Sequence, residues 1–348
     1  MKNLRWFDKF LFLLNSLFAV ALLFSYLLPF IPPKTFAILS VLSLAVPMLI
    51  LVNLLFFVYW VLRMKKQLLL PLIVLLIGFN HLTSIYEFSA SEEDELVGGI
   101  TFLSYNVRQF NQFRWSEEKD IPQKLSAFIK EQDPDILAMQ EYYKGELDIA
   151  MEFPHKYIKQ KEESAEFGLA IFSKYPIVNS GSLNFSTSSN NNSIYADIVI
   201  NNDTVRVVNV HLQSFTVKPN MNRLDLEQEE SKRVLKGMGQ TFVKQQEQLE
   251  RVMDVVRESL HKAVIMGDFN NTAYSYIYRE IKSLGFNDAY KEEGDGFGRT
   301  FDFDYFPLRI DYILPQEGIE TVYFTNFDVP YSDHYPIKAV LKIEPSKM

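Results

Sequence analysis

The sequence has no cysteine among its 348 residues, so disulfides, thiolate metal sites and cysteine nucleophiles are excluded. It also lacks an excess of basic charge, because 35 Lys and Arg stand against 43 Asp and Glu. A long-range positive field that attracts nucleic acid is therefore not evident, although a local basic patch is compatible with this composition. Neither absence selects a compartment, since a domain without disulfides is viable on either side of a membrane.

Charge is missing from three stretches near the N-terminus. They run from Phe10 to Pro33, from Thr35 to Leu62 and from Gln67 to Tyr86, and contain 24, 28 and 20 residues. A helix that crosses the hydrocarbon core of a bilayer needs about 20 mostly apolar residues, so each stretch is long enough. The third is the most polar of them because it contains Asn80 and His81. We predict three transmembrane helices, at about 10–31, 36–62 and 67–86.

A cleaved signal peptide is the alternative for the first stretch. Its apolar run is longer than a usual signal-peptide core, and two further apolar stretches follow it. A soluble helical bundle is disfavoured because none of the three stretches has a polar face to present to water. Residues 1–97 are therefore predicted to be an all-α membrane anchor.

The orientation of this anchor follows from where the cations lie. Lys2, Arg5 and Lys9 precede the first stretch, and Arg63, Lys65 and Lys66 separate the second from the third. Residues 91–95, after the third stretch, are acidic. The positive-inside rule then places the N-terminus in the cytoplasm and, after three crossings, residues 98–348 outside it. If the third stretch is re-entrant, the same residues face the cytoplasm.

From Gly98 onward, short β-rich runs alternate with charged helical stretches. The predicted strands are Ile100–Val107, Asp135–Met139, Gly168–Phe172, Tyr195–Ile200, Val205–Leu212, Ala263–Met266, Arg309–Leu314 and Ile337–Ile343. The predicted helices are Pro122–Lys130, Ser275–Leu284 and one or two helices within Leu224–Leu260. Strands mixed with helices favour an α/β sandwich over an all-β or all-α domain.

Polar side chains stand at the ends of several predicted strands, where the apolar pattern stops. They are Asn106, Gln140, Glu141, His211, Asp268, Asn270, Asp311, Asp333 and His334. A rigid scaffold can aim such side chains at one point. Carboxylate and amide oxygens suit hard cations, and imidazoles move protons, which together are what phosphoester hydrolysis requires. Each residue alone is explained as well by a turn or a helix cap, so the argument rests on the whole set.

The set resembles the endonuclease/exonuclease/phosphatase superfamily, which includes deoxyribonuclease-I-like nucleases, abasic-site endonucleases, sphingomyelinases and inositol polyphosphate phosphatases. The motifs, in order, are Leu103-Ser104-Tyr105-Asn106-Val107, Met139-Gln140-Glu141, Asn209-Val210-His211-Leu212, Gly267-Asp268-Phe269-Asn270, Arg309-Ile310-Asp311-Tyr312 and Ser332-Asp333-His334. The resemblance covers about residues 99–345. It implies a catalytic domain at 98–348 with a four-layer α/β sandwich, in which two packed mixed β-sheets are flanked by helices.

The same resemblance implies a metal site. Glu141 would be the principal ligand of Mg²⁺, or alternatively of Mn²⁺ or Ca²⁺. Asn106 and Asp333 would lie close to the ion or to its waters. No cofactor other than this divalent cation is implied.

The resemblance also assigns catalytic roles. Asp268 and Asn270 would position the nucleophilic water and the phosphate. His334, held by Asp311, would be the general base or a phosphate-orienting imidazole, and a carboxylate beside an imidazole independently favours such a role. His211 would face the scissile phosphate as a donor or acid. Arg309 is as compatible with a surface ion pair as with phosphate binding.

Two further segments, Asn271–Tyr276 and Gly294–Thr300, resemble a bacterial membrane-attached branch of the superfamily. This resemblance implies an integral protein of the bacterial inner membrane, with the bilayer as a partner and no obligate protein partner. The long stretch at 213–260 is compatible with a substrate lid, a membrane-facing flap or a solvated helical hairpin.

The substrate class stays open at this stage. A nuclease, a phospholipid or sphingolipid phosphodiesterase and an enzyme for small phosphate compounds all fit the motifs. The first 99 residues carry seven Lys and Arg against six Asp and Glu, which leaves the rest at about −9 and argues mildly against nucleic acid. A membrane-tethered binding module without catalysis is a hypothesis of another class, but every expected metal and proton-transfer position is occupied.

Overall fold

The computed structural model describes residues 5–88, 98–144, 153–161, 166–185, 191–215, 228–303 and 306–343. The predicted acidic segment 91–95 and the first part of the 213–260 stretch, 216–227, lie outside the described residues. The chain divides into two compact units. A helical unit contains residues 1–85, 216–246 and 272–280, and a sheet unit contains residues 86–215, 247–271 and 281–348.

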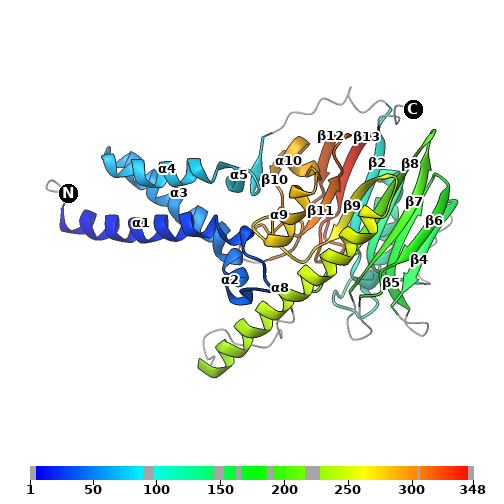
Figure 1. Cartoon of the computed structure of the whole chain (residues 1–348), viewed down its shortest axis with the longest axis horizontal. Coiled ribbons are helices and arrows are strands. Elements are labelled where there is room, and N and C mark those ends of the chain that lie inside the picture. Colours follow the sequence, from blue (N-terminus) through cyan, green and yellow to red (C-terminus); the bar gives the residue numbers. More distant parts are fainter. Residues whose placement is uncertain are drawn as a thin grey trace. The chain divides into compact units, whose positions relative to one another are not determined.

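The N-terminal part of the helical unit is built from apolar helices (Figure 1). They are α1 (Trp6–Ser25), η1 (Leu28–Phe30), α2 (Ala37–Val41), η2 (Leu42–Ala45), α3 (Val46–Leu62), η3 (Lys66–Leu68), α4 (Leu69–Ile77) and α5 (Phe79–Leu82). Two helical stretches, Trp6–Phe30 with 25 residues and Ala37–Leu62 with 26, are long and apolar enough to cross a membrane. The third predicted span forms a shorter apolar helix, Lys66–Ile77, followed by Gly78.

The few polar side chains inside these helices pair with one another. Trp60 Nε1 donates a hydrogen bond of 3.0 Å to Asn15 Oδ1, and Asp8 accepts from Tyr59 at 2.9 Å and from Arg63 at 3.1 Å. These bonds join α1 to α3. Pairing of this kind is what buried polar groups need where water is absent.

A segment from the second half of the chain also belongs to the helical unit. Tyr274 is buried in the same apolar cluster as Leu22 and Val74. Its hydroxyl donates to the carbonyl of His81 at 3.0 Å, and its ring stacks on the His81 ring with centroids 5.7 Å apart. The predicted helix at Ser275–Leu284 is α9 (Tyr276–Ser283), directly after this contact.

The sheet unit contains two large mixed sheets and a two-stranded ribbon of β1 (Tyr86–Glu87) and β10 (Gly296–Phe297). The six-stranded sheet has the order β12 (Ile319–Asn326), β13 (Ile337–Ile343), β2 (Ile100–Asn106), β3 (Ile136–Tyr143), β5 (Phe167–Ser173) and β4 (His155–Gln160). The five-stranded sheet has the order β11 (Asp311–Pro315), β9 (Lys262–Asp268), β8 (Asp203–His211), β7 (Asn192–Ile200) and β6 (Ile177–Ser182). All eight predicted strands are present.

The main core lies between the two sheets, where side chains such as Phe102, Ile136, Val207 and Met266 are fully buried. Burying one such side chain contributes about 1.5–3 kcal/mol, so the facing sheets supply most of the stability. This packing confirms the predicted α/β sandwich of two mixed sheets flanked by helices.

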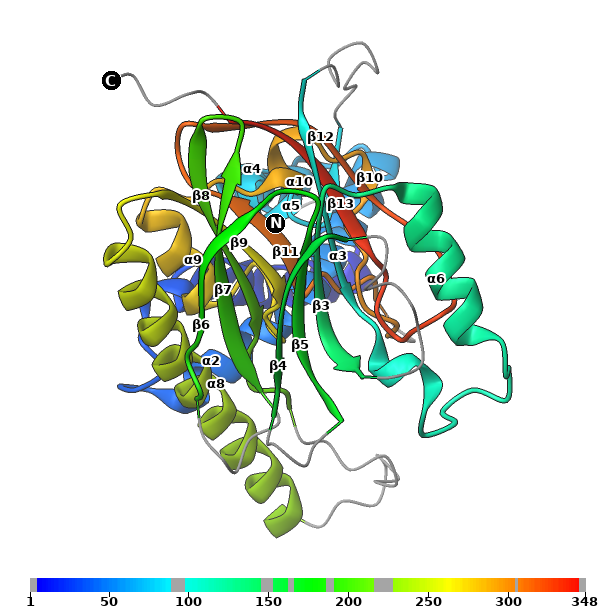
Figure 2. The ribbon, with the colours of Figure 1, turned by 90° about the vertical axis from the view of Figure 1, so that its right-hand side faces the viewer.

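Helices cover the outer faces of the sheets (Figure 2). Helix α6 (Ile121–Gln132) packs Leu125 and Phe128 onto the six-stranded sheet, beside Tyr105. The C-terminal part of α8 (Gln228–Arg257) lies on the five-stranded sheet, since Arg206 of β8 donates to the Val255 carbonyl at 2.7 Å. The remaining elements are η5 (Arg108–Asn111) and α10 (Ala289–Glu293).

Candidate active site

Strand register brings three of the predicted residues to one end of the five-stranded sheet. Asp268, the last residue of β9, is opposite His211 of the parallel strand β8. On its other side it is opposite Asp311, the first residue of the antiparallel strand β11. The backbone pairing alone therefore collects an imidazole and two carboxylates.

Asp268 is the centre of the cluster and is only 1% exposed. Its Oδ2 accepts a hydrogen bond of 3.0 Å from Asn106 Nδ2, and its Oδ1 accepts one of 2.8 Å from the Asn270 backbone N–H. The Nε2 atoms of His211 and His334 each lie 3.6 Å from Asp268 Oδ2. Asn106 comes from the six-stranded sheet, so the cluster joins both sheets.

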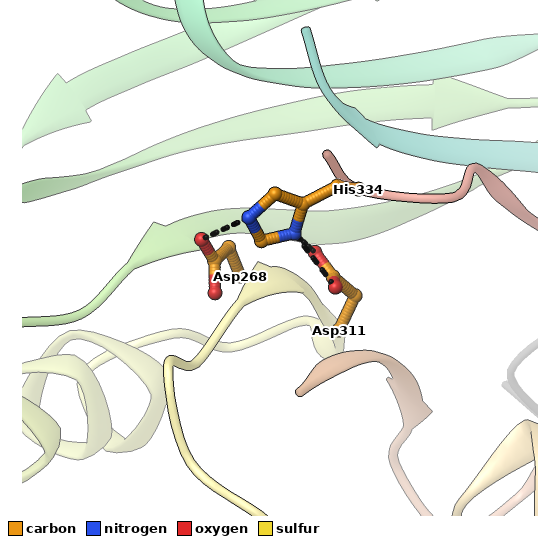
Figure 3. Close-up of side chains that lie close together, drawn as sticks. All are labelled: Asp268, Asp311 and His334. Atoms are coloured by element: carbon orange, nitrogen blue, oxygen red, sulfur yellow. Dashed lines mark hydrogen bonds and ion pairs between the residues drawn. The ribbon is translucent and has the colours of Figure 1, made fainter. Parts of the chain in front are cut away.

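His334 lies between two carboxylates, as Figure 3 shows. Its Nδ1 is 3.0 Å from Asp311 Oδ2, and its Nε2 points toward Asp268. Asp311 is itself fixed, because Thr300 Oγ1 accepts hydrogen bonds from the backbone N–H groups of Ile310 and Asp311, at 2.9 and 3.0 Å. A hydrogen bond to Asp311 therefore holds Nδ1, while Nε2 faces the Asp268 carboxylate at ion-pair distance.

Burial and these charges set the protonation of the three groups. Burial lowers the pKa of His334, but the Asp311 and Asp268 carboxylates outweigh it and raise this pKa to about 10. Burial raises the pKa of Asp268 to about 6. Burial lowers the pKa of His211, which favours its neutral form, whereas the raised pKa of His334 favours the imidazolium.

Replacing Asp311 with asparagine is expected to lower the pKa of His334, because the largest charge that favours the imidazolium is lost. The midpoint should fall by about one pH unit or more, the usual effect of removing a neighbouring carboxylate. ¹³C-histidine NMR titration of the full chain in detergent with EDTA measures it, and the chain has only five histidines to assign. An unchanged His334 midpoint in Asp311→Asn would contradict the arrangement of charges described above.

The three predicted metal residues lie in the same site. Burial raises the pKa of Glu141, while hydrogen bonds from Gln109 and Asn106 lower it. Gln109 Nε2 donates to Glu141 Oε2 at 3.0 Å. Asp333 forms an ion pair with Arg108, with Nη1 and Oδ2 3.2 Å apart. Asn106 thus contacts both Asp268 and Glu141, and the eight predicted residues belong to one cluster.

The donor set fits a hard divalent cation. Glu141 and Asp333 offer carboxylate oxygens, and Asn106 has an amide oxygen that here accepts the Arg108 backbone N–H at 3.1 Å. These are ligand types that Mg²⁺ and Mn²⁺ accept. A second set, Asp268, Asp311 and His334, has ligand atoms within 4.8 Å of one another. The raised pKa of His334, which lies between two carboxylates, disfavours the free lone pair that a metal-bound imidazole must offer.

Sequence reasoning missed three residues of this site: Arg108, Gln109 and Thr300. Arg108 and Gln109 contact predicted metal ligands from a turn that no glycine or proline marks. Thr300 belongs to the glycine-containing segment Gly294–Thr300 and fixes Asp311. Arg309 does not form a surface ion pair, since it is 5% exposed and bonds Asp288 at 2.8 Å.

A pocket of about 730 Å³ lies beside the segment that carries His334. Its lining residues are Phe297, Arg299, Asp302, Phe303, Phe306, Pro307, Asn326, Phe327, Asp328 and Tyr335. The Asp302 backbone N–H donates to the Asp333 carbonyl at 2.7 Å, so a pocket wall is bonded to the predicted metal-site segment. Half of the lining residues are aromatic, and the charged ones are one guanidinium and two carboxylates.

Two packed mixed sheets with a buried Asp–His cluster accompany a match to a family of phosphoester hydrolases. Residues 103–334, about two thirds of the 348-residue chain, match the endonuclease/exonuclease/phosphatase family, and the chain belongs to this family. Residues 8–85 match a domain of unknown function, DUF8431. A search of curated protein sequences found no match.

Solved structures share the fold. An endonuclease/exonuclease/phosphatase from Bacteroides vulgatus is 20% identical, with a TM-score of 0.55 over 71% of this chain and 99% of that one. TDP2 of D. rerio, solved with a single-strand DNA product, is 14% identical with a TM-score of 0.52, over 70% and 99%. The catalytic domain of human nocturnin, with bound sulfate, is 15% identical with a TM-score of 0.51, over 71% and 94%.

Proposed function

We propose that the chain is a membrane-anchored, divalent-metal-dependent phosphodiesterase. The observation that carries this proposal is the environment of Asp268, a buried carboxylate held by Asn106 and Asn270 between two imidazoles. A buried carboxylate held in this way can orient a water and take its proton, while the two imidazoles can donate hydrogen bonds to the phosphate oxygens.

Within this proposal Asp268 is the base for the attacking water. Burial raises its pKa to about 6, which brings its basicity close to neutral pH, where a general base is most effective. Asn270 holds the same carboxylate through its backbone N–H and its side chain, at 2.8 and 3.2 Å. These bonds fix the orientation of the carboxylate that would accept the proton of the water.

The two histidines take different roles. His334, kept as an imidazolium by Asp311, stabilises the charge that develops on a phosphoryl oxygen. His211, which burial keeps neutral, donates one N–H to another oxygen of the phosphate or to the leaving group. Of the two roles that the sequence left open for His334, the raised pKa favours the phosphate-orienting one.

Glu141 would hold the cation, with Asn106 and Asp333 close to it. When bound, the cation supplies Lewis-acid stabilisation of the phosphoryl oxygens. Mg²⁺ and Mn²⁺ are the ions that this oxygen set favours.

The pocket beside His334 supports a phosphodiester whose leaving group carries an apolar or aromatic part. Four phenylalanines and Tyr335 line it, Arg299 is paired with Asp302 at 2.7 Å, and Asp328 adds a second carboxylate. A lipid phosphodiester fits this lining and the proposed anchor, whereas a nucleic-acid backbone calls for several cations along a groove. Because the structure of TDP2 contains a single-strand DNA product, nucleic acid is the second candidate substrate class.

The proposed location is the bacterial inner membrane. The side of the membrane depends on the segment Lys66–Ile77, since three crossings leave the catalytic part outside the cytoplasm and two leave it inside. We keep the extracytoplasmic orientation as the proposal. Alkaline phosphatase fused after residue 95 is expected to be active, because it folds only outside the cytoplasm, and an inactive fusion with an active cytoplasmic reporter would refute this orientation.

The function itself is tested with the purified full chain in detergent. Bis-p-nitrophenyl phosphate, phospholipid and sphingolipid vesicles, single- and double-stranded DNA, RNA and inositol phosphates form the substrate panel. We expect Mg²⁺- or Mn²⁺-dependent cleavage of at least one phosphodiester, abolished by EDTA and restored by added metal. Binding of panel members without any turnover would instead favour the membrane-tethered binding module.

A further inference from the structure

The turn that follows Asn106 has an unusual backbone. Arg108, Gln109, Phe110 and Asn111 have φ values of 41°, 55°, 52° and 64°, four successive residues with side chains in the left-handed region. A Cβ disfavours this conformation, so single residues adopt it occasionally and runs of them rarely. Such strain persists only where the surroundings hold it, and it clusters at functional sites.

Two buried side chains hold the turn. Phe110 is 1% exposed, and its ring packs edge-on against Tyr142 with centroids 5.7 Å apart. Asn111 uses both ends of its amide, since Nδ2 donates to the Ser116 and Glu118 carbonyls and Oδ1 accepts from the Ser116 N–H at 3.0 Å. The remaining residues of the turn, Arg108 and Gln109, are thereby presented to the site.

Both of these residues reach predicted metal ligands. Arg108 pairs with Asp333 at 3.2 Å, and Gln109 Nε2 donates to Glu141 Oε2 at 3.0 Å. Glu141 itself has a φ of 52°, so its own backbone is in the left-handed region as well. Gln109 Oε1, by contrast, is buried and has no hydrogen-bond partner within the described parts of the chain.

Asn111, two residues along the same turn, pairs both ends of its amide, whereas Gln109 pairs only its Nε2. A buried amide oxygen left without a partner loses hydrogen-bond energy that a ligand can restore. The nearest bonded neighbour of this amide is the carboxylate predicted to bind the cation. A hydrated divalent cation at Glu141 would bring the hydrogen-bond donors that Gln109 Oε1 lacks.

We propose that Gln109 is a positioning residue of the cation site, in which Nε2 orients the Glu141 carboxylate and Oε1 accepts a hydrogen bond from the hydrated cation. This inference rests on the proposed metal-dependent function. The left-handed backbone of the turn brings the Gln109 amide to Glu141, where Asn106 at the end of β2 provides a second hydrogen bond.

The test is a direct measurement of Mn²⁺ affinity, with the full chain in detergent and free Mn²⁺ followed by EPR. Gln109→Met keeps the length of the side chain and removes both hydrogen-bonding ends. We expect its Kd for Mn²⁺ to rise about 10-fold or more, the usual effect of losing a residue that orients a metal ligand. The control Gln112→Met, at an exposed residue three positions along the chain, should keep the wild-type Kd.

Two further measurements distinguish a positioning role of Gln109 from a general role in the stability of the fold. Thermal unfolding of the metal-free Gln109→Met protein should match that of the wild type, and kcat at saturating Mn²⁺ should stay within a few-fold of it. If Gln109→Met does not fold, Gln109→Asn, which keeps an amide but is too short to span the gap, is expected to show the same rise in Kd. An unchanged Kd in either folded variant would overturn this inference, whereas a wild-type chain that binds no Mn²⁺ would overturn the proposed function.

Discussion

Replacing His334 with alanine is expected to lower kcat about 10³-fold, which corresponds to about 4 kcal/mol of lost transition-state stabilisation. The physical reason is that two buried carboxylates keep this imidazole charged, with its Nε2 3.6 Å from Asp268 Oδ2. Charge that develops on the phosphoryl oxygens would lose its nearest fixed cationic partner. The measurement is kcat on the best substrate of the panel, at saturating Mg²⁺.

His155→Ala provides the matched control. His155 is at the start of β4, an edge strand of the six-stranded sheet, and should leave kcat unchanged. Added metal should not rescue His334→Ala, because the proposed cation is held by Glu141. Full activity in His334→Ala would refute the assignment of the site.

The convergence of the site was predictable because its residues stand at or near the ends of predicted strands. Asp268 is in register with both His211 and Asp311, so the hydrogen-bond ladder alone places three polar residues together. Asn106, the last residue of β2, is likewise paired with Gln140 of the parallel strand β3. Short apolar runs followed by polar residues are enough to indicate such an edge.

The elements missed in the sequence share a physical cause. Three of the strands that were not predicted, β4, β6 and β12, are edge strands of their sheets. The side chains of β4 and β6 are mostly half-buried or exposed, so these strands have no continuous apolar run. The fourth edge strand, β11, was predicted because all five of its residues are buried and form an apolar run.

Gln109 and Arg108 were missed for a different reason. A left-handed turn is normally marked by glycine, and this one, which consists of Arg, Gln, Phe and Asn, contains none. Its conformation depends on the burial of Phe110 and Asn111, which only tertiary packing decides. Side chains that reach a site from such a turn have no local sequence signal.

The predicted membrane anchor shows that the length of an uncharged stretch is not enough to predict a spanning helix. The stretch Gln67–Tyr86 has no charge and about the length of a bilayer, yet its helix ends at Ile77, before Gly78, and a short second helix follows. Gly is the residue least able to keep a helix intact apart from Pro, so composition within the stretch mattered more than its length. The number of crossings therefore stays a prediction.

Replacing Glu141 with alanine is the second large effect that we expect. Activity at 1 mM-scale Mg²⁺ should fall roughly 10³-fold, because the principal oxygen ligand is lost and the cation no longer neutralises the phosphoryl oxygens. Burial raises the pKa of Glu141, which means that its ionised form needs a positive partner in the site, and a divalent cation is such a partner. The measurement is initial rate against Mn²⁺ concentration.

The dependence of the initial rate on Mn²⁺ concentration distinguishes a loss of metal binding from a loss of proton transfer or charge stabilisation. In Glu141→Ala the rate should rise again as Mn²⁺ is increased, since the mutation weakens binding and leaves Asp268, His211 and His334 in place. In His334→Ala the curve should keep its midpoint and lose its plateau. Glu320→Ala, an exposed carboxylate on β12, controls for the loss of one negative charge and should follow the wild type. A Glu141→Ala curve with wild-type midpoint and plateau would mean that the cation, if it binds, is held elsewhere.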